Sequence, residues 1–368
     1  MWVWLLPLLI VCLLLLGPRW ARARCTVTSK AFLFSGQKAE AQVQMVLQTW
    51  VPLFARLEGD GSAPLGVMAW GGRALVWGRW RLEDKLLLLA RRRGEHHLPG
   101  VRVFVRDLLG VLEREVHLSL ERGAVVVYPE IHPALLPHLR RTLLADGHPA
   151  EGGMEDATRF VGVRAYTPGD PLRHLHWKAT ARYGQLMMRE FERVKSSAIW
   201  LHLDLQGEGR VGEVYLEHAS SLAASLLRAA SEEGLAVGLS LGGRSIPVGF
   251  GTIHEQRLLA ELGRARPQQN PTPVPDPEPG TNLILVTMLA SAKVLEGALR
   301  ARARTSQVHL VALPEGFFLW PGEKGRRVFG MTDGVQQLLR KRNHLVSEGV
   351  QVHILRGNQS VLGLGHQP

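Results

Sequence analysis

The sequence predicts a chain that joins an all-β part to an α/β part, and three observations support this fold class. Residues 1–17 carry no charged side chain, which predicts an N-terminal membrane helix. Residues 26–129 hold short segments of alternating apolar and polar side chains, which are typical of a small β-sandwich. From Ser197 onward, apolar strands alternate with segments of helical period, which predicts βαβ units and a doubly wound, mostly parallel sheet.

The uncharged N-terminal segment predicts where the protein lies. At ~1.5 Å per residue, residues 1–17 are just long enough to cross a bilayer core. Arginines follow the segment at positions 19, 22 and 24, and the positive-inside rule places that side in the cytoplasm. We therefore expect a single-pass protein of the cell membrane with a cytoplasmic body and an anchor at residues 1–24. A cleaved signal peptide, which would place the body outside the cell, is the alternative.

Strand patterns fill residues 25–130, the predicted sandwich domain. Val101–Arg106 alternates cleanly, Ala39–Leu47 alternates in part, and Arg81–Arg92 fits a strand or a helix. Further strands are predicted at Val116–Leu120 and Ala124–Tyr128. Short strands between glycine-rich turns predict a small antiparallel sandwich of the general immunoglobulin-like kind, which more often serves as a spacer or binding module than as a catalyst.

A connector of residues 131–158, rich in proline and glycine, precedes the predicted α/β domain of residues 159–368. The helical period predicts helices at Glu213–Glu233, Ile253–Leu262, Ala292–Arg304 and Gly334–Glu348. Strands are predicted at Ile199–Leu205, Ala236–Leu241, Leu283–Met288, Gln307–Leu313 and Val350–Leu355.

The stretch 160–193 holds the highest density of residues that suggest a specific structural or binding role. Pro168, Gly169 and Asp170 form a tight turn, because proline suits its second position and glycine supplies positive φ. Several arginines flank the turn, with Trp177 among them. One interpretation is a structural staple, in which guanidinium groups bond carboxylates and stack on Trp177, so that Asp170→Ala or Trp177→Ala lowers stability. The other is a docking surface for an acidic partner or a phosphate.

The same stretch resembles the signature of the bacterial family known as domain of unknown function 58. The pattern is F-x-G-x-R-x-Y-x-P-G-D-x-x-R-x-x-x-W-x-x-T-A-R. Here its positions are Phe160, Gly162, Arg164, Tyr166, Pro168, Gly169, Asp170, Arg173, Trp177, Thr180, Ala181 and Arg182. The resemblance implies a second domain similar to a von Willebrand factor A domain. It also implies an association with MoxR-type AAA+ ATPases and with membrane proteins of the same complex.

In von Willebrand A domains a metal site is built on D-x-S-x-S after the first strand. Asp204 occupies the first of these positions, but Gln206 and Glu208 replace the two serines. No aspartate follows the later strand, which ends at Thr287-Met288. We therefore expect no cofactor and leave Asp204 as a weak candidate for Mg²⁺, with the bonding of a neighbouring loop as its main role.

The composition and the absence of certain motifs argue against several other classes of function for this sequence. The net charge of +11 favours an anionic membrane surface or an acidic protein, and no motif of a specific nucleic-acid reader is present. The cysteines, Cys12 and Cys25, provide neither a disulfide framework nor a metal site for the body of the protein. His174 and His176 have no third ligand marked in the sequence, so we expect surface or capping histidines.

Together these observations predict a membrane-anchored, non-enzymatic protein-interaction or assembly factor that acts with a MoxR-type AAA+ ATPase. The alternative is a metal-dependent or phosphate-processing enzyme that uses the basic cluster around the signature turn.

Overall fold

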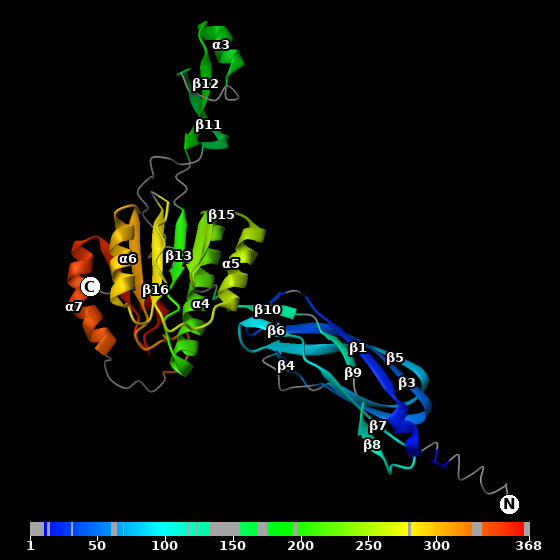
Figure 1. The fold of residues 1–368 in the computed structure, drawn as a ribbon. Coiled ribbons are helices and arrows are strands. Elements are labelled where there is room, and N and C mark those ends of the chain that lie inside the picture. Colours follow the sequence, from blue (N-terminus) through cyan, green and yellow to red (C-terminus); the bar gives the residue numbers. More distant parts are fainter. Residues whose placement is uncertain are drawn as a thin grey trace, which may run out of the picture. The chain divides into compact units, whose positions relative to one another are not determined.

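A computed structural model of the chain describes residues 11–12, 15–30, 32–59, 65–68, 70–116, 118–122, 124–132, 155–167, 175–193, 198–278, 281–325 and 333–363. The chain divides into two compact units (Figure 1). The first comprises Met1–His132 with Leu259–Ala265, and the second comprises Pro133–Leu258 with Arg266–Pro368.

One long, bent hairpin builds most of the first unit. Its strands, β3 (Lys38–Gly59) and β5 (Gly71–Ala90), pair antiparallel along nearly their whole length, with a register shift between Thr49 and Leu53. Pro52 lies within this shift, where it has no N–H to donate, and Gly78 on the partner strand takes a φ of 68°. The hairpin therefore bends at this point.

The bend lets the two halves of β3 pair with different neighbours. The first half pairs with β1 (Arg22–Thr28) and the second half with β7 (Val101–Arg106), which continues to β8 (Glu113–Glu115). Their inward side chains, including Val43, Leu57 and Val103, share one buried apolar core. Further elements of the first unit are η2 (Gly17–Trp20), β2 (Phe32–Phe34), β4 (Leu65–Val67), β6 (Gly94–His97), β9 (Leu118–Arg122) and β10 (Ala124–Tyr128).

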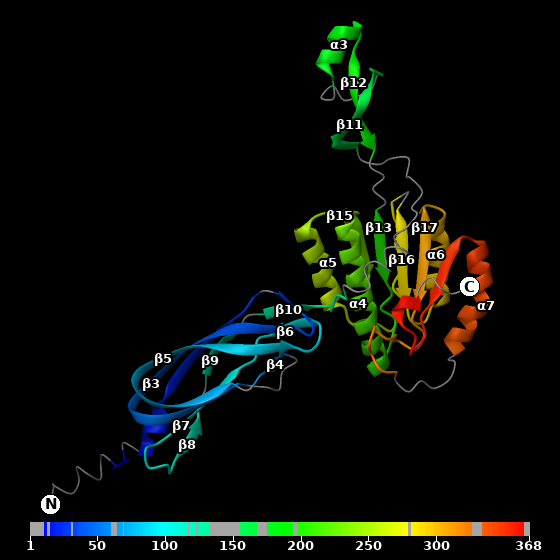
Figure 2. The same cartoon turned by 180° about the vertical axis from the view of Figure 1, so that it is seen from behind.

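A six-stranded sheet forms the centre of the second unit (Figure 2). Its order is β15-β14-β13-β16-β17-β18, in which β15 runs antiparallel to β14 and the other neighbours are parallel. The strands are β13 (Ile199–Leu203), β14 (Val237–Leu241), β15 (Arg244–Gly249), β16 (Asn282–Thr287), β17 (Gln307–Ala312) and β18 (Val350–Ile354).

Helices follow the strands and bury apolar faces against the sheet. α4 (Gly209–Glu232) contacts β13, β14 and β16, while α6 (Ala292–Arg302) and α7 (Asp333–Ser347) share a core with β16, β17 and β18. α5 (Thr252–Arg264) comes after β15, and η6 (Val361–Gly363) ends the described chain. A separate hairpin of β11 (Glu155–Ala165) and β12 (Met187–Arg193) carries the short helix α3 (Trp177–Tyr183).

The predicted fold class is wrong for this chain. Among the described residues, strands account for 42% and helices for 27%, so the described structure is mostly β and is not shown to be a doubly wound parallel sheet of the von Willebrand A type. The long β3–β5 hairpin raises the strand content, and β15 makes the sheet of the second unit mixed. The sandwich was also expected to be antiparallel, whereas β9 pairs with β1, and β10 with β2, in parallel.

The predicted N-terminal membrane helix is likewise not shown. Among the described residues, no helix combines the length and the apolar character that crossing a bilayer requires. Gly17–Trp20 is a 3₁₀ turn, and strand β1 begins at Arg22, within the predicted anchor. Residues 1–10 lie outside the described residues, and the location at the cell membrane stays a prediction.

Three histidines in the sheet of the second unit, the buried His202 and His309 and the half-buried His353, were not predicted. His202 on β13 is bonded to the Ser240 hydroxyl through Nδ1 at 2.7 Å. His309 on β17 and His353 on β18 share a contact of 3.3 Å between Nδ1 and Nε2. Burial lowers the pKa of His202 to about 3, and it lowers the pKa of both His309 and His353 to about 4.

We predict that the free energy of unfolding falls as the pH drops from about 6.5 to about 4. In this range the three histidines bind protons in the unfolded chain but stay neutral in the folded chain, so lower pH favours unfolding. Their contribution is complete above pH 6.5. Urea unfolding of the whole chain at several pH values measures the slope. His202→Asn should reduce it. A slope that is unchanged in this variant would contradict this origin.

Candidate functional site

The carboxyl ends of β13 and β16 meet at one edge of the six-stranded sheet, where open α/β sheets usually place ligands. Asp204 follows β13 directly and is fully buried. Thr287 is the last residue of β16, the neighbouring strand, and is also fully buried. These two side chains form the polar centre of the edge, which we call the Asp204 site.

The Asp204 carboxylate accepts three hydrogen bonds from the chain. Oδ1 accepts from the backbone N–H of Thr272 at 2.9 Å and from that of Gln206 at 3.2 Å. Oδ2 accepts from the Thr287 hydroxyl at 2.8 Å. The Asp204 backbone also takes part, since its carbonyl accepts from the Tyr215 hydroxyl at 2.7 Å. One side chain thus joins β13, β16 and the loop around Thr272.

Burial raises the pKa of Asp204, although the bonds from Thr272, Thr287 and Gln206 oppose this shift. The environment is therefore apolar enough to make the charge costly and supplies specific donors in compensation. An acid with this surrounding stabilises loops. Its oxygens accept three hydrogen bonds from the chain and have no exposed surface, and the weak expectation of Mg²⁺ at Asp204 stays a prediction.

Close backbone packing completes the Asp204 site. A Cβ atom at Gly207 would lie 2.9 Å from the Cα of Gly212, in the first turn of α4. The Gly207 N–H donates to the Gln268 carbonyl at 2.9 Å, and the Gln268 N–H donates to the Leu205 carbonyl at 2.8 Å. The loop after β13 is thus pressed between α4 and residues 268–272. No group of three or more acidic, histidine or cysteine side chains suitable for a metal occurs among the described residues.

The signature residues lie elsewhere, on the β11–β12 hairpin and α3 (Figure 1). Pro168, Gly169, Asp170, Arg173 and His174 fall outside the described residues. Of the others, Arg164 and Tyr166 belong to β11 and the residues that follow it, and Trp177, Thr180 and Arg182 belong to α3.

Thr180 attaches α3 to β12. Its Oγ1 accepts from the Met187 N–H at 3.0 Å, and the Met187 carbonyl accepts from the His176 N–H at 2.8 Å. His176 also caps the helix, because its Nδ1 accepts from the Ala179 N–H at 3.0 Å. At the other end, Gly184 adopts a φ of 68° and closes the helix. A seven-residue helix is thus fixed at both ends and on one side.

Two further side chains of the signature, those of Trp177 and Arg182, are exposed. Trp177 is 70% exposed, and Arg182 is exposed beside Tyr183, with its guanidinium 6.0 Å from the ring centre. Arg164 donates to the Ala165 carbonyl at 3.2 Å and to the Thr167 hydroxyl at 3.4 Å. Thr180 therefore fixes α3 to β12, and Trp177 is exposed to solvent. The staple interpretation also involves Asp170 and Arg173, which lie outside the described residues, and it stays a prediction.

Sequence reasoning missed the partners of Asp204. Thr287 was noted only as the place where a second carboxylate was expected, and Thr272 and Tyr215 were not singled out. A threonine at the end of a strand next to the strand of Asp204 was a usable signal, because neighbouring parallel strands end at the same edge. Thr272 lies in a proline-rich loop whose path no sequence pattern specifies.

Comparison with known proteins finds similarity in the region that contains the signature. The family described as "Protein of unknown function DUF58" matches residues 162–277. The uncharacterized protein YeaD of Bacillus subtilis (strain 168) is 31% identical over 178 residues, which cover 47% of this chain and 43% of the relative. These matches support the DUF58 family. The chain spans less than half the length of this curated relative, whose function is itself not described.

Solved structures give only remote likenesses. The CARDB domain of the PF1109 protein from Pyrococcus furiosus covers 29% of this chain at 10% identity, with a TM-score of 0.20 and 93% of its own chain matched. A β-D-mannosidase from Dictyoglomus thermophilum covers 91% of this chain at 11% identity, with a TM-score of 0.19 and 35% of its own chain matched. Scores this low carry no argument about fold or function.

We predict that Asp204→Ala lowers the free energy of unfolding by about 1–3 kcal/mol or more, because it leaves buried donors without an acceptor. Chemical denaturation of the whole chain measures the loss. Asp276→Ala is the matched control, since that carboxylate is 55% exposed in an ion pair with Arg300 and should change stability little. Equal stability of the two variants would remove Asp204 as the brace of this edge.

A second prediction concerns the signature helix. Thr180→Val should speed amide hydrogen exchange at Met187, because the amide loses its acceptor, whereas Thr180→Ser should preserve protection. Trp177→Ala should leave exchange at Met187 unchanged, since the indole is exposed. A Trp177→Ala variant that exchanged as fast as Thr180→Val would restore Trp177 to the structural staple.

Proposed function

We propose that the chain is a non-enzymatic protein-interaction or assembly factor that acts with a MoxR-type AAA+ ATPase and with membrane proteins of the same complex. The observation that carries the proposal is the exposed face of α3, a surface that the fold holds rigidly but does not use for its own packing. The resemblance to the DUF58 signature supports the choice of partner.

The exposed face follows from the helical period. Trp177 and Ala181 are one turn apart, as are Lys178 and Arg182, so these four residues lie on neighbouring rows of the helix surface. Ala179 is buried and points toward the hairpin, on the other side of the helix. An exposed tryptophan flanked by a lysine and an arginine has the composition of an interface centre, where aromatic residues and arginine are enriched.

Charge indicates the kind of surface that α3 would meet. Lys178 and Arg182 repel each other across one turn, and the first turn of the helix contains no acidic residue. Arg182 lies in the last turn, where a cation is favourable, but Lys178 gains nothing from that end. An acidic patch on the partner would relieve the repulsion, and the indole would bury against apolar atoms beside it.

The Asp204 site lends no support to the metal-dependent alternative, because its carboxylate is already bonded to Thr272, Gln206 and Thr287. The exposed face of α3 is explained by binding to a partner, without any catalysed reaction. We therefore place the interaction at α3 and assign Asp204 to stability.

We predict that Arg182→Glu and Trp177→Ala each weaken binding of a purified MoxR-type ATPase from the same organism at least tenfold, a loss of about 1.4 kcal/mol that is typical of an interface residue. Titration of the whole chain with the ATPase measures Kd. Arg304→Glu, an exposed charge reversal on the second unit, is the control and should bind like the unchanged chain. Equal affinity for Arg182→Glu and Arg304→Glu would reject α3 as the contact.

A further inference from the structure

The loop between β7 and β8 displays apolar side chains on a rigid frame. Asp107 is fully buried and accepts backbone N–H bonds from Leu109 at 2.8 Å, from Val111 at 3.3 Å and from Leu112. The loop closes on itself through the Asp107 N–H, which donates to the Leu112 carbonyl at 3.1 Å. Yet Leu109 is 61% and Val111 is 74% exposed. A rigid loop with exposed apolar side chains is prepared for an apolar environment.

More exposed apolar side chains gather at the same end of the first unit. The bend of the β3–β5 hairpin carries Trp50 and Trp77, which are 81% and 73% exposed. Beyond the bend, Phe54 pairs with Leu75 on one side and with Arg106, the last residue of β7, on the other. The bend and the β7–β8 loop are therefore neighbours.

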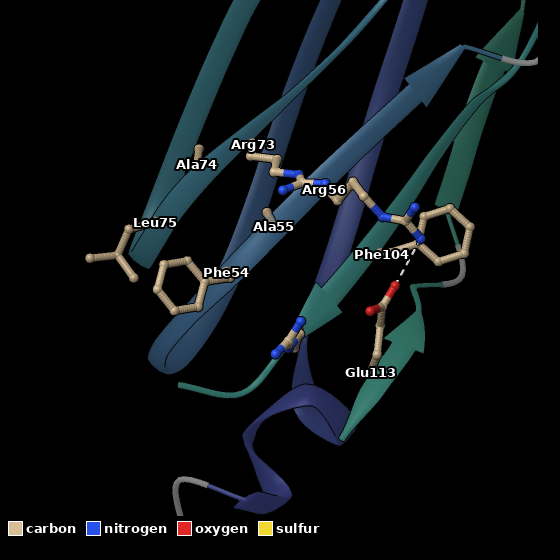
Figure 3. Close-up of a pocket in the computed structure, with 9 residues that line it drawn as sticks. Phe54, Ala55, Arg56, Arg73, Ala74, Leu75, Phe104 and Glu113 are labelled. Atoms are coloured by element: carbon tan, nitrogen blue, oxygen red, sulfur yellow. Dashed lines mark hydrogen bonds and ion pairs between the residues drawn. The ribbon is translucent and has the colours of Figure 1, made fainter. Parts of the chain in front are cut away.

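The turn η2 joins this end through two contacts. Gly17 lies directly against Val51, beside the bend, and the Arg114 guanidinium of β8 donates to the Arg19 carbonyl at 3.0 Å. Figure 3 shows η2 next to β8 and β7. In the sequence, the uncharged stretch 1–17 leads directly into η2. We call the bend, the β7–β8 loop and η2 the apolar tip.

Two arginine-lined grooves flank the apolar tip. The first, of about 590 Å³, is lined by Arg56, Arg73 and Arg106 together with Phe54 and Phe104 (Figure 3). Arg56 is paired with Glu113 at 2.8 Å and lies over the Phe104 ring. Within the described residues, Arg73 and Arg106 form no ion pair or hydrogen bond through their guanidinium groups, so this groove has unneutralised positive charge.

The second groove, of about 720 Å³, is lined by Arg22, Arg24, Arg79 and Arg114. Strand register explains the clustering: Arg22 lies opposite Gln48, which lies opposite Arg79 on the next strand. The row beside it repeats the pattern with Arg24, Val46 and Arg81, so four arginines stand on one exposed patch. No carboxylate partner of these four occurs in the part of the chain that the structure describes. Like charges this close are unfavourable without an anion.

We propose that the apolar tip docks on a lipid bilayer that contains anionic phospholipid. The Leu109 and Val111 side chains enter the upper acyl region, the exposed tryptophans occupy the interface that tryptophan prefers, and the arginines of the two grooves meet lipid phosphate groups. A bilayer suits this end because its exposed apolar side chains lie beside arginines that have no carboxylate partner among the described residues, and because η2 follows an uncharged stretch of the sequence. The proposal requires no spanning helix and is independent of the proposed role of α3.

The direct test measures the environment of the tip in the whole chain. A spin label on Leu109→Cys, in a Cys12→Ser background, reports access to oxygen and to a water-soluble nickel chelate; Cys25 is buried. With vesicles containing phosphatidylglycerol, this label should gain oxygen access and lose nickel access. A label on Gln37→Cys, in the turn at the opposite end of the β3–β5 hairpin, should keep nickel access. Both sites are exposed, so the fold should tolerate both labels.

A second measurement tests the arginines. Flotation with phosphatidylglycerol vesicles should fall roughly fivefold for each of Arg22→Gln and Arg79→Gln, because each arginine near an anionic surface contributes to partitioning, and high salt should weaken binding. Arg304→Gln should float like the unchanged chain, and vesicles of phosphatidylcholine alone should bind more weakly in every case.

Three outcomes would overturn the proposal. The chain could fail to float with anionic vesicles, or it could float while the Leu109 label keeps the water access of the Gln37 label. The Leu109 label could also show spin–spin broadening without lipid, which would make the tip a contact between copies of the chain or with another protein. Loss of nickel access at Leu109 alone, together with the arginine dependence, supports docking on the bilayer.

Discussion

Buried loops must satisfy their backbone N–H groups, and in each unit of this protein one aspartate meets that requirement. Asp204 accepts from the N–H groups of Thr272 and Gln206, and Asp107 accepts from those of Leu109, Val111 and Leu112. A charge in such surroundings is favourable only when donors replace the lost water. The same interaction therefore fixes the edge of the sheet in one unit and the β7–β8 loop in the other.

The two aspartates nevertheless have different structural roles. Two of the three donors of Asp204, Thr272 and Thr287, come from segments far from it in sequence, so its bonds join β13, β16 and the loop of Thr272 into one edge and leave no exposed surface. The donors of Asp107 lie within five residues of it, so its bonds shape one loop and leave Leu109 and Val111 exposed. The first arrangement is typical of a structural core, whereas the second prepares a surface for contact.

The sequence predicted regular elements better than it predicted the fold. The helical period at Glu213–Glu233 is confirmed by α4 at Gly209–Glu232, and the clean alternation at Val101–Arg106 is confirmed by β7. Such patterns report which side of a single element is buried. They do not report which elements pair, and the fold class was wrong because the β3–β5 hairpin and the antiparallel β15 change the balance between strand and helix.

The candidate site shows the same limit. The ambiguous segment Arg81–Arg92 belongs largely to β5, because it pairs with β3 along its length, and no local pattern could show that pairing. Asp204 was found from its place after a strand, but its donors Thr272 and Thr287 come from distant segments. Trp177 was recognised as important, yet its exposure depends on how α3 packs against β12 through Thr180 and Met187.

The positions of the arginines help to decide whether the excess of positive charge has a function. A net charge of +11 in an arginine-rich chain is compatible with a bias of composition that has no function. Some arginines do have carboxylate partners within the chain: Arg56 is paired with Glu113 at 2.8 Å in the first unit, and Arg228 with Glu255 at 3.0 Å in the second. The arginine rows beside the apolar tip have no such carboxylates among the described residues, and neighbouring side chains there are exposed and apolar. Arginines that lack carboxylate partners lie beside exposed apolar side chains at this end of the first unit. Such a combination indicates a surface that binds another molecule or a membrane.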